Sequence, residues 1–200
     1  MGLTSEVTAP QATLRSMSRI HVVQREELSA DDLAGLLAWL EEAYGDPIGS
    51  WRRETWTDIG PGPHFLVHDT AAELLAHACI DWVPVTIGDA TLEAGYLEAV
   101  ATRIDSRRKG LGSLVVEAAQ REIEARAEIG FLGTGTMPFY ERLGWIRWTG
   151  PTSVTERDGS ITRTAEEDDA IMALVLPRTP AWVRPDLPIR RPRRDPEEPW

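Results

Sequence analysis

The residues best suited to chemistry stand together at 105–114, in the stretch DSRRKGLGSL. Three cations, Arg107, Arg108 and Lys109, precede the sequence Gly-Leu-Gly, and Lys109 is the only lysine of the chain. Glycines let a backbone approach an anion closely and direct several N–H groups at it, and a helix start adds partial positive charge. The stretch therefore predicts a backbone cradle for a pyrophosphate, although a basic turn before a helix would also explain it.

Hydrophobic periodicity indicates the elements that must hold this stretch in place. The predicted strands cover 19–24, 64–69, 74–89, 91–104, 129–135, 145–150 and 170–177, and the predicted helices cover 28–45, 111–128 and 137–145, with a short helix around 51–56. Ser29 and Asp32 are expected to cap the first helix at its start, and Gly45 at its end. Strands mix with helices, so the fold class is α/β or α+β around one central mixed sheet.

The length of 200 residues favours one folded domain, which we place at 19–177. Residues 1–18 are expected to be a flexible leader without the apolar core of a secretory signal. The Pro- and Arg-rich tail, 178–200, is expected to be extended and irregular. No apolar run is long enough to cross a membrane, so we expect no membrane association.

The formal net charge of -11 argues against nucleic acid as a partner, because phosphate binding needs a basic surface. An acidic body suits a cationic ligand, although solubility alone would also explain it. Cys79 is the only cysteine, which excludes an internal disulfide and a thiolate metal cluster and fits a reducing cytoplasm. His64 and His68 lie in a predicted strand, where their spacing does not bring them together, so we expect no metal.

The sequence EAVATRIDSRRKGLG (98–112) resembles the Gcn5-related N-acetyltransferases (GNAT), whose pattern [RQ]-x-x-G-x-[GA] it matches at each fixed position. The resemblance implies the GNAT fold, with a mixed, mostly antiparallel sheet flanked by helices, and acetyl-coenzyme A as the cofactor. It implies that the pyrophosphate lies on the N–H groups of Lys109, Gly110, Leu111, Gly112 and Ser113, with Arg107 and Arg108 at the rim. It also implies that the pantetheine arm runs along Val100, Ala101 and Thr102 like an added strand.

A narrower resemblance is to the aminoglycoside 2'-N-acetyltransferase family. It depends on GYLEAVA (95–101), FYERLGW (139–145), GPTSV (150–154), TRT (162–164), an acidic cluster and a terminal tryptophan, in this order. The similarity runs from about Arg19 to Val175 and returns at Trp200. It implies acetyl transfer to an amine of an aminoglycoside, which gives antibiotic resistance, and relatives of this fold often pair as homodimers.

Each step of acetyl transfer needs a matching group, and the resemblance supplies candidates. Glu98 is the candidate base that takes the amine proton through water. The backbone N–H of Val100 is the candidate donor to the oxyanion, and Tyr140 is the candidate acid for the leaving thiolate. A solvated strand carboxylate and a core aromatic are the ordinary explanations of Glu98 and Tyr140.

A polycationic sugar needs several carboxylates or carbonyls in a cleft. By resemblance the substrate contacts are Glu98, the loop at Gly133 and Thr134, one of Glu167, Asp168 and Asp169 with Asp168 preferred, and Asp46, Glu198 and the Trp200 carboxylate. The run of acids could equally be a solvated charge cluster. The terminal tryptophan predicts that the tail folds over the cleft.

Three regions depart from the family pattern and leave the substrate open. Ser50 stands where a second aspartate is expected, the tail is richer in arginine and proline, and the loop GTGTMPFY (133–140) is shorter than usual. A smaller aminated sugar such as kasugamycin is one option, and another small amine or a polyamine is a second. A non-catalytic module that binds an acyl-coenzyme A or a cation is the alternative outside enzymes.

Overall fold

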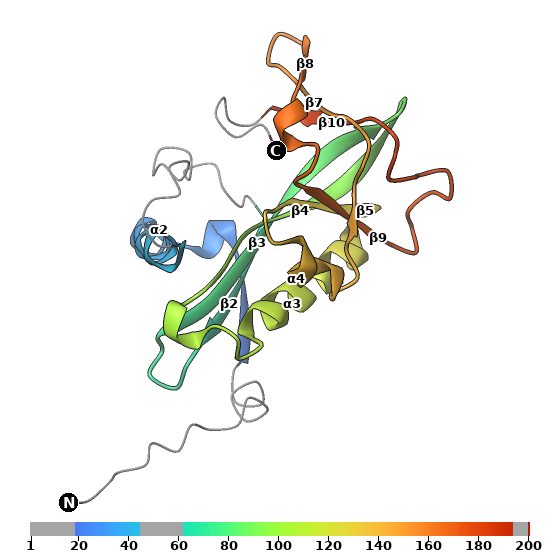
Figure 1. The fold of residues 1–200 in the computed structure, drawn as a ribbon. Coiled ribbons are helices and arrows are strands. Elements are labelled where there is room, and N and C mark those ends of the chain that lie inside the picture. The colour runs from blue at the N-terminus through green and yellow to red at the C-terminus, as the bar shows by residue number, and fades with distance from the viewer. Residues whose placement is uncertain (1–18, 45–61, 194–199) are drawn as a thin grey trace, which may run out of the picture.

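The computed structural model describes residues 19–44, 62–193 and Trp200. Within them one ten-stranded sheet has the order β6-β9-β5-β4-β3-β10-β7-β8, with β2 also pairing with β3 and β1 with β2 (Figure 1). The strands are β1 (Arg19–Gln24), β2 (Pro63–His68), β3 (Leu74–Ile87), β4 (Ala90–Thr102), β5 (Ile129–Gly133), β6 (Ile146–Arg147), β7 (Thr152–Thr155), β8 (Ile161–Arg163), β9 (Ile171–Val175) and β10 (Ile189–Pro192).

The sheet is mixed and mostly antiparallel, as predicted. Strand β4 runs parallel to β5 and β10 runs parallel to β7, whereas the other described pairs are antiparallel. The long β3–β4 hairpin forms the middle of the sheet. Within the described residues, no helix is long and apolar enough to cross a membrane.

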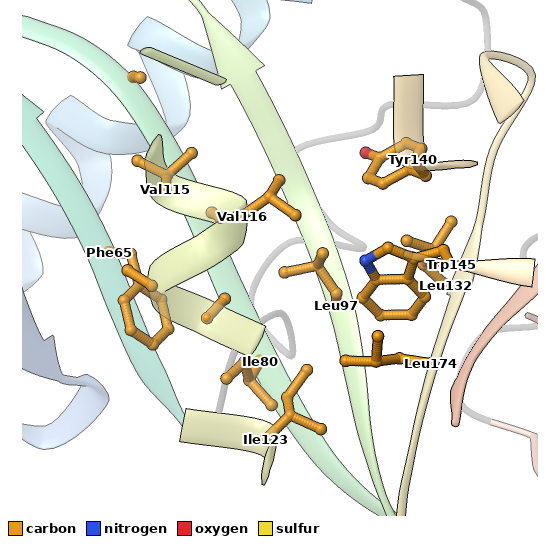
Figure 2. Packing of buried hydrophobic residues seen from close by; sticks show 14 of the residues in the cluster. Phe65, Ile80, Leu97, Val115, Val116, Ile123, Leu132, Tyr140, Trp145 and Leu174 are labelled. Carbon is orange, nitrogen blue, oxygen red and sulfur yellow. The ribbon is translucent and has the colours of Figure 1, made fainter. Parts of the chain in front are cut away.

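Two helices cover opposite faces of the sheet. Helix α3 (Leu111–Arg126) packs on the face that holds Ile80 and Leu97, and Figure 2 shows this cluster. Helix α2 (Ala30–Tyr44) packs on the other face, against Cys79 and its neighbours. Alternation along β3 explains the division, because successive side chains of a strand point to opposite faces. The short helix α4 (Met137–Glu141) follows β5.

The predicted start of the first helix is confirmed. The backbone N–H of Asp32 donates to Ser29 Oγ at 3.1 Å, and the N–H of Ser29 donates to the Asp32 carboxylate at 3.0 Å. This reciprocal pair satisfies two N–H groups at the helix end. The predicted cap at Gly45 and the predicted helix at 51–56 lie outside the described residues.

The prediction of an irregular tail is wrong for Ile189–Pro192, which forms β10 between β3 and β7. One of the two buried side chains of this strand is charged: Arg191 is 3 % exposed, lies 3.6 Å from Asp81 and stacks 4.5 Å from the Tyr96 ring centre. A strand whose buried side chain is charged does not show the expected alternation of apolar residues. The short strands β7 and β8 were also missed, because β7 buries Thr152 and Val154 and β8 buries none of its side chains, so neither shows an alternation of apolar residues.

Candidate active site

The sheet opens between β4 and β5. The two strands pair in parallel only between Ala94–Tyr96 and Ile129–Phe131 among the described residues, although β4 continues to Thr102. Figure 2 shows them spreading apart beyond Leu97 and Leu132. The edge of β4 that this divergence leaves offers main-chain groups to an extended amide-containing ligand, as a neighbouring strand would.

A β-bulge interrupts β4 at this opening. The register with β3 shifts between His77 and Cys79, and Ala99 has φ 54, which is uncommon for a residue other than glycine. His77 Nδ1 lies 2.8 Å from the Ala99 carbonyl oxygen, and the Tyr44 hydroxyl donates to the Val100 carbonyl at 3.0 Å. The bulge is therefore held from β3 and from α2, and it sets the backbone at Val100.

The predicted anion cradle lies at the start of α3. Arg108 has φ 60 and Gly110 has φ 83, so the chain turns sharply through left-handed conformations before the helix. The first helical hydrogen bond runs from the N–H of Leu114 to the Gly110 carbonyl at 3.0 Å. The N–H groups of Leu111–Ser113 precede this bond, and α3 itself therefore offers them no acceptor. Such a terminus is chemically suited to a pyrophosphate.

The cradle is tied to the rest of the site by Arg107. Its guanidinium donates to the Ala43 carbonyl at 2.6 Å and to the Thr102 carbonyl at 3.2 Å, so it joins the ends of α2 and β4. Arg107, which the resemblance places at the pyrophosphate rim, also holds this loop through these two hydrogen bonds. A Cβ on Gly112 would come within 3.2 Å of Thr102 Oγ1, so this glycine allows α3 to begin close to β4.

Glu98 lies on the face of β4 that α2 covers. It is half-buried, and its register partner on β3 is the buried Cys79, whose sulfur lies 3.7 Å from the Glu98 carbonyl oxygen. Leu97, one residue earlier, faces α3. The Glu98 carboxylate and the start of α3 therefore lie on opposite faces of β4.

Tyr140 stands on α4 at the opening. Its side chain is 7 % exposed and packs edge-on against Phe139, with ring centres 4.8 Å apart. Burial raises the pKa of the phenol well above its ordinary value, so the hydroxyl keeps its proton at neutral pH. Figure 2 draws the oxygen on the side of the ring that faces Val116 and Leu97.

Trp145 carries a buried N–H between the diverging strands. The residue is 2 % exposed, and its Nε1 has no hydrogen-bond partner among the described residues. Figure 2 shows the indole between Leu97 and Leu132. A buried donor without a partner is costly, which indicates a missing acceptor such as an amide carbonyl of a bound ligand. Sequence reasoning did not single out Trp145, because a tryptophan near a helix end is usually part of the core.

The family-specific segments form one hydrogen-bonded network. Thr152 Oγ1 lies 2.7 Å from the Thr164 carbonyl, the Thr164 hydroxyl donates to Thr152 Oγ1 at 2.8 Å, and Arg163 donates to the Thr152 carbonyl at 2.7 Å. The indole Nε1 of Trp200 donates to Thr164 Oγ1 at 3.1 Å, and its ring contacts the cluster around Phe131. Figure 1 shows the C-terminus beside this segment.

The three candidate acids differ in their surroundings. Both carboxylate oxygens of Asp168 are engaged, by Arg163 and by the N–H of Thr152, and the hydrogen bond from Arg163 lowers its pKa to about 2. Glu167 is half-buried, and burial raises its pKa, whereas Asp169 is exposed. The preference for Asp168 as a substrate contact is thus weakened, because its carboxylate already completes the threonine network.

The remaining predicted contacts lie at the open end of β5 or outside the described residues. Gly133 ends β5, and a Cβ there would meet Tyr96 Oη at 3.0 Å. Thr134 follows it, with its N–H donating to the Ala170 carbonyl at 2.8 Å. Asp46 and Glu198 lie outside the described residues.

A group of buried polar side chains lies next to Glu98 on the same face. His64, His77 and Cys79 offer ligand atoms within 4.8 Å of one another, and this is a group that could hold a metal. His64 Nδ1 is 3.0 Å from His77 Nε2, and His77 Nδ1 contacts the bulge. Sequence reasoning missed this group because the histidines are brought together only by the pairing of β2 with β3.

The comparisons with known proteins agree with this geometry. Residues 32–145 match the model of the acetyltransferase (GNAT) family. The chain belongs to this family. It is 31 % identical, over 76 % of its length and 77 % of the relative's, to an aminoglycoside 2'-N-acetyltransferase from Mycolicibacterium fortuitum, which confirms the narrower resemblance.

Solved structures show the same fold. ElaA from Escherichia coli has a TM-score of 0.54 and 20 % identity and covers 78 % of this chain and 99 % of its own. Eis1 from Mycobacterium abscessus has a TM-score of 0.55 and 14 % identity. The match covers 68 % of this chain and 33 % of Eis1. A GNAT acetyltransferase from Brucella melitensis, solved with acetyl-CoA, has a TM-score of 0.50 and 18 % identity and covers 64 % of this chain and 83 % of its own.

This member of the GNAT family is an N-acetyltransferase that uses acetyl-coenzyme A. The residues present fit that cofactor on three counts: the N–H groups at the start of α3, the open edge of β4 and the buried indole N–H of Trp145.

Proposed function

We propose that this N-acetyltransferase moves the acetyl group of acetyl-coenzyme A to the 2'-amino group of an aminoglycoside. The observation that carries the proposal is the position of Glu98, on the α2 face of β4 and two residues before Val100, with the start of α3 on the opposite face. The relationship to the Mycolicibacterium enzyme supports the choice of amine.

The cofactor is held by backbone and core groups. The N–H groups of Lys109–Ser113 bind the pyrophosphate, with the charges of Arg108 and Lys109 beside it. The pantetheine arm lies along the open edge of β4, where it contacts the backbone of Val100–Thr102 and the indole N–H of Trp145. Arg107 keeps this arrangement by joining α2 to β4.

The substrate ammonium loses two protons in the reaction, one to Glu98 and one that is balanced by protonation of the leaving sulfur. Glu98 accepts the proton of the substrate ammonium, through water, so that the neutral amine attacks the thioester carbon. The Val100 N–H donates to the carbonyl oxygen as negative charge develops there, which is worth a few kcal/mol when the donor is already aimed. As the C–S bond breaks, the nitrogen of the tetrahedral intermediate loses its second proton and the sulfur gains one, so that the products are a neutral amide and the free thiol of coenzyme A.

Tyr140 serves the leaving sulfur. Burial keeps its phenol protonated, so a hydrogen-bond donor is present at every pH in the working range. A phenol with a raised pKa is a weak acid, and its main contribution is a hydrogen bond to the developing thiolate, with proton transfer completing late.

The polar surroundings favour a polycationic sugar. The chain has a net charge of -11, which attracts cations. We assign substrate contacts to Glu98, Glu167, Asp169 and the Trp200 carboxylate, in addition to Asp46, Glu198 and the loop at Gly133 and Thr134. In this proposal Asp168 holds the threonine network instead. Acetylation removes a charge that an aminoglycoside needs to hold ribosomal RNA, which would give resistance.

A thiol-release assay tests this function. Acetyl-coenzyme A would be offered with gentamicin-type, tobramycin-type and kasugamycin-type compounds, matched compounds that lack a 2'-amine, and plain polyamines. The proposal predicts turnover where a 2'-amine is present. Turnover of the polyamines alone would replace the substrate class, and a natural protein that binds acetyl-coenzyme A without any turnover would favour a non-catalytic module.

A further inference from the structure

A buried pair of histidines reaches the bulge of β4 from the neighbouring strands. His64 on β2 is 2 % exposed and His77 on β3 is 0 % exposed. His64 Nδ1 and His77 Nε2 lie 3.0 Å apart, and His77 Nδ1 lies 2.8 Å from the carbonyl oxygen of Ala99. The reaction proposed above uses neither ring, so their burial and mutual contact need an explanation of their own.

The contacts fix which nitrogen carries each proton. A carbonyl oxygen only accepts, so His77 Nδ1 must carry the hydrogen that is donated to Ala99. In the neutral ring Nε2 is then an acceptor, and His64 Nδ1 must be the donor to it. Burial, and secondly the proximity of His64, lowers the pKa of His77 to about 3, so the ring stays neutral at working pH.

The hydrogen bond from His77 controls a peptide group at the reacting centre. The peptide between Ala99 and Val100 is planar and trans, so its carbonyl and its N–H point in opposite directions. Fixing the Ala99 carbonyl on His77 therefore directs the Val100 N–H away from the His77 ring. Ala99 is also held at φ 54, a conformation that persists only where its surroundings enforce it.

We propose that His77, oriented by His64, is a positioning residue that aims the Val100 N–H at the thioester oxygen. The inference rests on the proposed function only in taking Val100 as the oxyanion donor. Tyr44 complements it, because its hydroxyl holds the next carbonyl along the strand, that of Val100. The two side chains together hold both ends of the residue that carries the donor.

Three substitutions of His77 separate this role from simple packing. In His77→Asn the side-chain amide nitrogen takes the place of Nδ1, in His77→Gln it takes the place of Nε2, and His77→Leu offers no donor. We expect kcat to fall about 100-fold in His77→Leu, the order of loss found when one oxyanion donor is removed. His77→Asn should stay within about fivefold of the natural protein, and His77→Gln should resemble His77→Leu. The Kd of acetyl-coenzyme A should change less than about threefold, since the cradle is remote.

A spectroscopic readout keeps the test independent of the acceptor amine. The carbonyl carbon of bound [1-13C]acetyl-coenzyme A should resonate downfield in the natural protein and in His77→Asn, because a hydrogen bond polarises the carbonyl. That shift should be lost in His77→Leu and His77→Gln. If no amine is turned over, the proposed function fails, whereas the carbonyl resonance still decides the role of His77.

Two further variants serve as controls. His68→Leu removes a half-buried histidine from the same strand pair and should leave kcat within about twofold. Cys79→Ala removes the thiol of the potential metal group and neither ring, and it should leave kcat within about threefold. Equal kcat and equal carbonyl resonance in His77→Asn, His77→Gln and the natural protein would overturn the proposal. A loss in Cys79→Ala as large as in His77→Leu would also overturn it, because a metal would then organise the site.

Discussion

The indole Nε1 of Trp200 donates a 3.1 Å hydrogen bond to the hydroxyl of Thr164, which joins the last residue of the chain to the network around Thr152. The ring also packs on the cluster that contains Phe131 of β5. Trp200 is thereby anchored beside β5. A tail that supplies substrate contacts must be held in this way.

Removing the Trp200 anchor should weaken substrate binding. In Trp200→Ala the lost hydrogen bond and ring contacts release the carboxylate, and we expect the KM of the aminated sugar to rise about tenfold. The KM of acetyl-coenzyme A should not change, because the cradle lies at the other side of the opening. Steady-state kinetics with each substrate varied in turn measures both. An unchanged sugar KM would show that the tail takes no part in recognition.

Replacing the proposed base should slow the chemistry. Glu98→Gln keeps the size of the side chain but cannot accept the amine proton, so kcat/KM should fall by roughly 100-fold to 10,000-fold. Thiol release from pH 6 to 9 measures the loss. The rate of the variant should recover as the pH rises and more of the amine is neutral in solution. A variant as active as the natural enzyme would remove Glu98 from the mechanism.

Tyr140→Phe should lower kcat about 100-fold without preventing folding, since the phenol is buried and only its oxygen is lost. Burial raises the pKa of Tyr140, and below pH 10 both the folded and the unfolded protein carry the phenolic proton. Above pH 10 the unfolded chain loses that proton first, so stability should fall as pH rises. Urea unfolding of the natural protein and Tyr140→Phe between pH 9 and 11 should show a shallower decline in the variant. Equal declines of stability in the two proteins would contradict the raised pKa of Tyr140, and an unchanged kcat would remove Tyr140 from the mechanism.

Asp168 should matter to stability more than to substrate affinity. Its pKa is lowered to about 2, mainly by the hydrogen bond from Arg163, so its stabilising effect is present above the ordinary value of 3.8 and is lost as pH falls through about 2. Asp168→Asn should lower Tm at pH 7 by roughly 3–6 °C. Its Tm should also fall less than that of the natural protein between pH 4 and 2. A variant with normal Tm and a much higher sugar KM would make Asp168 a substrate ligand after all.

The backbone of the cradle gives a matched pair of substitutions. Gly110 has φ 83, and a residue with a side chain is strained there by about 1–2 kcal/mol. Gly112 is helical, and a Cβ added to it would need Thr102 to move by only tenths of an ångström. Gly110→Ala should therefore raise the Kd of acetyl-coenzyme A about tenfold and Gly112→Ala much less. Calorimetric titration measures both, and the reverse order would contradict the assigned geometry.

The fold and the identity of the cofactor could be predicted from the sequence because their signals are local. The run from Glu98 to Ser113 contains a strand, a cradle and a helix start whose residue types are required at each position. The substrate side depends on contacts that no local pattern shows. In the sequence His77 is an ordinary strand histidine, and only the pairing with β4 brings it to the Ala99 carbonyl. Asp168 is one acid of a run, and only the fold shows that its oxygens accept hydrogen bonds from Arg163 and Thr152.

β10 was missed because one of its two buried side chains is an arginine. Arg191 is tolerated in the interior only because Asp81 and the ring of Tyr96 face it, and these residues are about 100 positions away in sequence. Residues so far away in the sequence that neutralise a buried charge cannot be inferred from the alternation of residues along one strand. The same limitation applies to Trp200, whose partner Thr164 stands on another segment.

The most direct test of the proposed chemistry is the position of the acetyl group in the product. The enzyme would be given acetyl-coenzyme A with an aminoglycoside that bears a 2'-amine and, in parallel, with its analogue that bears a 2'-hydroxyl, and the products would be examined by NMR. We predict a single acetyl group on the 2' nitrogen of the first compound and no product from the second. Acetylation of another amine, or equal turnover of both compounds, would contradict it.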